Sequence, residues 1–175
     1  MSQNRSLNHT YLIPIFIFLA LIFDGIVMNL FAEHFISPSY ILTPRLLLFV
    51  LVVFTIFFPK QPLFLYALLF GIIYDSYYAG ILGLYAAGLA TVIYLIKRLQ
   101  TYLNPTVLVS LILFIFADAY LETFIFAMYR LLGYTGMSFQ VFLSTRLGPT
   151  LLLNIVFFIV CYYPFYRLSQ WMYEQ

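Results

Sequence analysis

The chain has 175 residues, of which 65% are hydrophobic and only 8% are charged, with a formal net charge of +2. A soluble domain usually carries roughly 25% charged residues. The composition therefore excludes an ordinary water-soluble enzyme, a disordered chain and a nucleic-acid binder that relies on a basic patch. It is typical of an integral membrane protein, and at about 20 apolar residues per span the chain could supply five or six spans.

The first apolar segment is predicted at 11–31 and contains one acidic residue, Asp24. After a polar loop, the second is predicted at 44–58. Arg45, at its start, can extend its guanidinium to the membrane interface. Two prolines in the turn at 59–62 end this segment, because a helix cannot continue through them.

The next apolar run, 63–96, is too long for one crossing. As a helix it would measure roughly 51 Å, against a hydrocarbon core of roughly 30 Å. The polar, glycine-containing stretch at 75–80 is the natural break. We therefore predict a hairpin with arms at 63–74 and 81–96.

Two further spans complete the chain, at 105–132 and 147–165, separated by a loop over 133–145. The predicted fold is an all-α integral membrane protein, a single membrane domain over 1–175 with a bundle of about six transmembrane helices. Six crossings place both chain ends on one side of the membrane.

Basic residues are distributed unevenly between the two sides of this topology. The side with the chain ends has five and the other side has three: Arg5, Lys60, Lys97, Arg98 and Arg167 against Arg45, Arg130 and Arg146. Because cytoplasmic loops carry the excess of Lys and Arg, we expect both ends to be cytoplasmic.

Sequence patterns of catalysis are missing. We find no nucleophile elbow, no histidine-rich metal spacing and no phosphate-binding glycine loop. His9 and His34 fall on opposite sides of the predicted membrane, and Cys161 lies in an apolar run. We predict no enzymatic activity, no cofactor and no metal.

Acidic residues inside apolar segments are the informative polar groups, because a charge in the membrane is costly unless it is paired, solvated or neutralised. Besides Asp24, these are Asp118 and Glu122, which share one helix face. Arg130 lies roughly 12 Å further along that helix, too far for direct pairing. Three interpretations stay open: a contact with a partner subunit, a proton-coupled site, or acids that the chain satisfies internally.

Small side chains recur every four positions in the fourth segment, at Ala79, Gly83, Ala87 and Thr91. On one helix they would form a smooth stripe that allows close helix packing. The stripe either packs inside this chain or faces another membrane subunit.

The turn between the third and fourth segments combines Gly71, Asp75, Gly80 and Gly83. Gly71 allows a neighbouring backbone to approach, and Gly80 can adopt a positive φ at the turn. Asp75 can accept backbone N–H groups at the start of the next helix.

This stretch, Gly71 to Asp75 followed by Gly80 to Ala86, resembles the core motif of the MreD family of rod shape-determining membrane proteins. The chain length, the six apolar segments and the proline turn before the motif fit the same family. The resemblance implies a non-enzymatic subunit of the bacterial cell membrane that helps to organise peptidoglycan synthesis during cell elongation.

The resemblance also implies partners. These are a single-span MreC-like protein and, in a wider complex, the MreB filament, the RodA glycosyltransferase and a class B penicillin-binding protein. The family is similar to the substrate-binding subunits of energy-coupling-factor transporters, so a vitamin-type transport subunit is the alternative function. Binding of a lipid-linked wall precursor is a third and weaker hypothesis. The 20 phenylalanines favour a filled interior over a ligand cavity.

Overall fold

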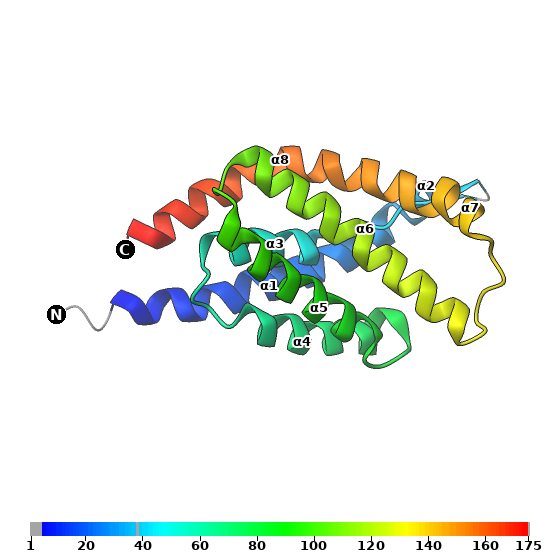
Figure 1. Cartoon of the computed structure of the whole chain (residues 1–175), viewed down its shortest axis with the longest axis horizontal. Helices are drawn as coiled ribbons and strands as arrows, with labels where there is room; N and C mark the ends of the chain where they lie inside the picture. Colours follow the sequence, from blue (N-terminus) through cyan, green and yellow to red (C-terminus); the bar gives the residue numbers. More distant parts are fainter. Residues whose placement is uncertain (1–4, 38, 175) are drawn as a thin grey trace.

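The computed structural model describes residues 5–37 and 39–174 and is an all-α bundle (Figure 1). Its six main helices are α1 (Arg5–Leu30), α3 (Leu46–Phe57), α4 (Leu63–Tyr74), α5 (Leu84–Leu99), α6 (Val107–Leu131) and α8 (Gly148–Glu174). Short elements join them: α2 (Ala32–Phe35), β1 (Ile36–Ser37), β2 (Tyr40–Ile41), η1 (Asp75–Ala79), η2 (Gln100–Tyr102), α7 (Phe139–Phe142) and η3 (Leu143–Leu147). The predicted fold class is confirmed.

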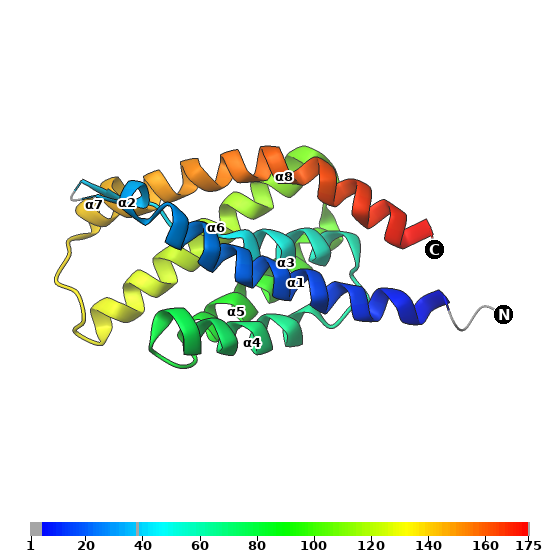
Figure 2. The ribbon, with the colours of Figure 1, turned by 180° about the vertical axis from the view of Figure 1, so that it is seen from behind.

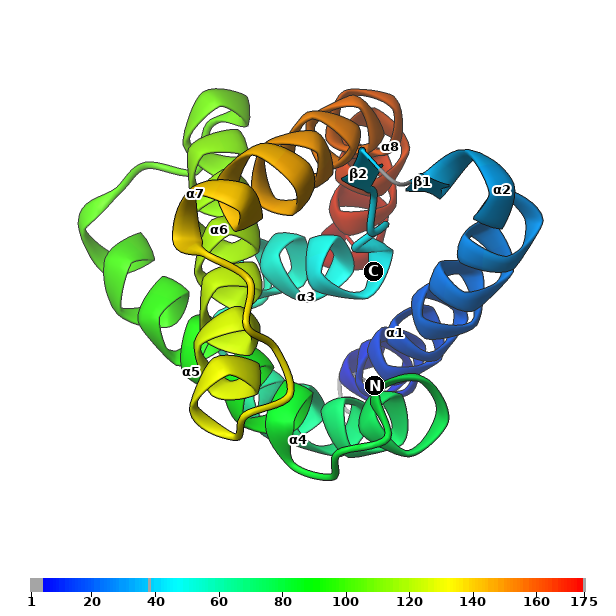
Figure 3. The same cartoon turned by 90° about the vertical axis from the view of Figure 1, so that its right-hand side faces the viewer.

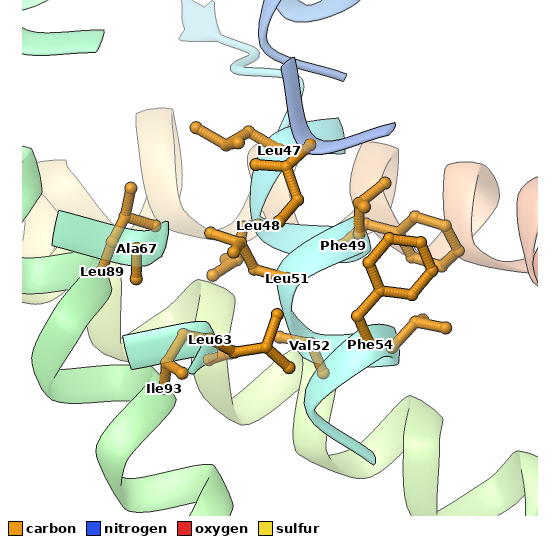
Figure 4. Packing of buried hydrophobic residues seen from close by; sticks show 14 of the residues in the cluster. Leu47, Leu48, Phe49, Leu51, Val52, Phe54, Leu63, Ala67, Leu89 and Ile93 are labelled. Carbon is orange, nitrogen blue, oxygen red and sulfur yellow. The ribbon is translucent and has the colours of Figure 1, made fainter. Parts of the chain in front are cut away.

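Helix α3 is the centre of the bundle. Every residue from Leu47 to Ile56 is buried, as expected for a helix that is hydrophobic on all sides. It contacts α1, α4, α5, α6 and α8, and the end-on view of Figure 3 shows it surrounded by them. Figure 4 shows the aliphatic part of this packing, where Leu48, Leu51 and Val52 of α3 meet side chains of α4 and α5.

Aromatic rings fill the other side of α3. The ring of Phe49 lies edge-on to Phe114 of α6 and to Phe158 and Phe165 of α8, with centroid distances of 5.7, 5.7 and 5.3 Å. Edge-to-face pairs at this spacing are favourable beyond the apolar area that they bury. Bulky side chains therefore fill the interior along α3, as the phenylalanine content predicts.

Helix lengths vary more than the predicted spans do. Among the described residues, three helical stretches have the length and apolar composition of a membrane span, at Tyr11–Leu30, Val107–Leu131 and Phe139–Met172. Helices α3 and α4 have 12 residues each, or roughly 18 Å. The central helix can be short because other helices, rather than lipid, surround it.

One segment end and one loop also differ from the prediction. Helix α8 continues beyond residue 165 to Glu174, and the expected loop at 133–145 contains α7 and part of η3. The start of α1 and the end of α8 lie at the same end of the bundle (Figures 1 and 2).

Candidate functional site

An extended segment enters the bundle before α3 begins. Unpaired backbone groups are costly inside a membrane protein, and α8 supplies their partners. Thr150 Oγ1 accepts from Thr43 N at 3.3 Å and donates to Ile41 O at 3.2 Å. Asn154 donates from Nδ2 to Thr43 O at 3.0 Å and accepts at Oδ1 from Arg45 N at 3.0 Å. Two α8 side chains thus hold the chain in place as it leads into α3.

Asp24 of α1 caps the first turn of α3. Its two carboxylate oxygens accept from Leu46 N at 2.6 Å and from Leu47 N at 2.9 Å. These are among the N–H groups that a helix start leaves without a partner, and they form its positive end. The carboxylate is buried. Its two hydrogen bonds to α3 offset the free-energy cost of burying an acid, and they fix where α3 begins.

Glu122 of α6 forms ion pairs with two arginines. Oε1 binds the guanidinium of Arg45, and Oε2 accepts from Nε of Arg146 of η3 at 2.9 Å. The Arg45 guanidinium also lies over the ring of Tyr85 of α5, at 5.0 Å from its centroid, and donates to the Tyr85 hydroxyl.

The Arg45 side chain does not extend out of the bundle as expected, since it is only 2% exposed. The extended segment before α3 brings Arg45 into the bundle, where Glu122 supplies the counter-charge.

Asp118 lies one turn before Glu122 and is equally buried, but its partner is different. Oδ2 accepts from Asn154 Nδ2 at 2.8 Å, while Oδ1 has no hydrogen-bond partner in the described structure. We call Asp24, Arg45, Asp118, Glu122, Arg146 and Asn154 the polar network. All three acids predicted to lie in the membrane have partners within this chain: Asp24 binds backbone N–H groups of α3, while Asp118 and Glu122 bind side chains of the network.

The α4–α5 hairpin is built around the four residues predicted for its turn, Gly71, Asp75, Gly80 and Gly83. Asp75 is fully buried and accepts from the backbone N–H groups of Gly83, Tyr85 and Ala86, at 2.9, 2.9 and 3.1 Å. Gly80 and Gly83 have φ angles of 71° and 92°, which favour glycine. A Cβ at Gly71 would overlap the backbone of Ala86, so α4 and α5 can pack closely there.

The proposed stripe of small residues does not run along one helix. Ala79 belongs to η1, and Gly83 precedes α5 in a left-handed conformation, so only Ala87 and Thr91 share the helix. The two positive-φ glycines break the regular spacing on which the prediction depended. Ala87 and Thr91 are exposed, and the side chain of Ala79 lies outside the described part.

A glycine outside the stripe makes the close contact instead. A Cβ on Gly88 would come within 2.7 Å of Leu121 of α6.

A pocket of about 250 Å³, with Asp24 and Arg146 of the network in its lining, lies among α1, η1 and η3. Its lining includes Asp24, Gly25 and Met28 of α1, Thr43, Tyr78 of η1 and Arg146 of η3. The elements that line the pocket, which are the last turns of α1, η1 and η3, lie at the end of the bundle away from the two chain ends (Figures 1 and 3). Among the described residues, no group of three or more His, Cys, Asp or Glu side chains could hold a metal ion.

The residues of the polar network, the hairpin and the pocket all lie within the region that a known family model matches. The family model described as rod shape-determining protein MreD matches residues 7–172. The chain belongs to the MreD family. It is 29% identical over 155 residues to the rod shape-determining protein MreD of Bacillus subtilis (strain 168), covering 89% of this chain and 90% of that protein. No solved structure matches the chain significantly.

Membership of the MreD family identifies a membrane protein that determines cell shape. The hairpin was found from sequence because its residues lie close together in the chain. Arg146 and Asn154 were missed as network residues. The sequence signal for them was weak. Asn154 has the only side-chain amide in 147–165, and three acids in apolar segments needed hydrogen-bond donors.

Proposed function

We propose that this MreD-family chain is a non-enzymatic scaffold subunit of the cell-elongation complex, a single membrane domain that holds a single-span, MreC-like partner. The observation that carries the proposal is the way its buried charges are used. Ion pairs and caps join α1, α3, α6, η3 and α8 to one another. Such a network favours a bundle of fixed shape, which suits a subunit that positions other proteins.

We propose that both chain ends are cytoplasmic. Arg45 and Arg146 pair with buried Glu122, so they do not act as free loop charges. On the side away from the chain ends, Arg130 is then the one basic residue outside the network. The side with the chain ends keeps all five of its basic residues, and this difference supports the assignment.

The outer surface of α5 at Ala87 and Thr91 is the proposed contact for the partner's transmembrane helix. Both residues are exposed, and both are small. Small side chains let helix backbones approach closely in a membrane, where packing drives association. The partners of the wider assembly, MreB, RodA and a class B penicillin-binding protein, are proposed on family membership.

Co-purification in detergent tests the docking surface. Ala87→Trp and Thr91→Trp are expected to lower recovery of an MreC-like partner at least five-fold, because each bulky ring would separate the two helices. Val156→Trp on α8 is the matched control, since Val156 is 57% exposed on another helix. Equal recovery with all three variants would rule out this surface, and a chain that never recovers the partner would contradict the scaffold function. No observation favours the vitamin-transport alternative.

A further inference from the structure

The pocket beside the polar network is the feature that the scaffold function leaves unused. Its lining contains two charged side chains of opposite sign, Asp24 and Arg146, and the hydroxyl-bearing residues Thr43 and Tyr78. At about 250 Å³ it has room for about eight waters. This is below the range of roughly 300–1,000 Å³ that is usual for drug-sized ligands, so a small polar group fits better than a vitamin.

Arg146 is the residue that can recognise an anion in this pocket. Its Nε–H donates to Glu122, whereas the described hydrogen bonds leave its four terminal N–H donors unused. Its side chain is 31% exposed and is part of the pocket lining. A guanidinium with free terminal nitrogens matches the oxygens of a phosphate in a bidentate arrangement.

Asp24 supplies the opposite charge. Its oxygens already accept two backbone N–H groups of α3, and each oxygen can accept a further bond. A ligand that carries both a phosphate and an ammonium group would satisfy both charged walls.

The position of the pocket points to the bilayer as the source of this ligand. Asp24 lies six residues before the end of α1 at Leu30, or roughly 9 Å. Each headgroup layer is roughly 5–7 Å thick. If the end of α1 lies level with the outer headgroups, Asp24 therefore lies close to the border between headgroups and hydrocarbon. Phe23 and Ile26, which neighbour Asp24 and Gly25 in the sequence of α1, are exposed and can contact acyl chains.

We propose that this pocket binds the headgroup of a membrane phospholipid, with the phosphate on Arg146 and an ammonium group beside Asp24. The lipid is a structural ligand at the end of the bundle opposite the chain ends. Binding depends on this chain alone, so the proposal and the scaffold function can fail separately.

Native mass spectrometry of the delipidated full-length chain, titrated with dioleoylphosphatidylethanolamine, tests the site. We expect one lipid to bind saturably. Arg146→Gln should reduce its occupancy at least five-fold. Arg130→Gln is the matched control, because it removes the same charge from an exposed position outside the pocket and should leave occupancy unchanged.

Because Arg146→Gln also removes an ion pair with Glu122, a second variant fills the pocket without altering charge. Met28→Trp should lower occupancy to a similar extent while the thermal unfolding midpoint stays within a few degrees of the parent. Equal occupancy in the parent and all variants would indicate surface lipid only and overturn the proposal. Saturable binding of inorganic phosphate that the lipid does not displace would identify a soluble phosphate as the ligand and overturn it as well.

Discussion

The starts of α3 and α5 solve the same problem in different ways. At each start a buried aspartate accepts backbone N–H groups. At α5 the acceptor is Asp75, whose most distant partner, Ala86, is 11 positions further along the chain. At α3 the acceptor is Asp24, which lies 22 and 23 positions before its partners in another helix.

The two starts also differ in what surrounds the cap. The α5 cap is completed by glycines with positive φ and involves no ion pair with Asp75 among the described residues. The start of α3 adds Arg45, its counter-ion Glu122 and the amide of Asn154. A local turn can be fixed by a few neighbouring residues, whereas a helix that enters from an extended segment is fixed from several elements.

The largest expected effect comes from leaving Arg45 without its counter-ion. Glu122→Gln should destabilise the bundle by about 3–5 kcal/mol, because breaking a buried ion pair leaves an uncompensated charge. Equilibrium unfolding in mixed micelles measures the loss.

Glu33→Gln is the control, because Glu33 is exposed in α2 and its loss should change stability by less than about 0.5 kcal/mol. The double variant Arg45→Met with Glu122→Leu should recover most of the stability, since an apolar pair can replace a buried ion pair. A Glu122→Gln protein as stable as the control would show that the ion pair does not hold α3.

A smaller effect is expected from removing either cap. Asp75→Ala should cost about 2 kcal/mol and Asp24→Ala about 1 kcal/mol, within the range for lost helix caps. Asp75 serves three N–H groups and Asp24 serves two, while Asn154 still holds Arg45 N. Hydrogen exchange at the first turns of α3 and α5 would locate each loss, and a greater loss at α3 would reverse this order.

The contrast between a cap formed by nearby residues and a cap supplied by a distant helix also explains which features the sequence could predict. Composition and segment length gave the all-α membrane fold, and the spacing of Gly71, Asp75 and Gly80 gave the hairpin, because those partners are local. The network could not be assembled from sequence, because nothing in the spacing of Glu122 indicates that Arg45 and Arg146 converge on it. The predicted stripe of small residues was wrong because it assumed regular helix spacing across Gly80 and Gly83, which lie between η1 and α5.

The final variant tests the α5 start alone, with an expected effect no larger than that of losing the Asp75 cap. Gly83→Leu should destabilise the chain by about 1–2 kcal/mol, the cost of a left-handed conformation for a residue with a side chain. The space beside Gly83 is open, since no atom lies within 4 Å of a Cβ built there, so strain rather than collision is the cause. Cys161→Ser, a nearly isosteric change at a half-buried side chain of α8, should have less effect in the same unfolding assay. If Gly83→Asn, which tolerates positive φ, is as unstable as Gly83→Leu, then backbone strain is not what makes glycine necessary at this turn.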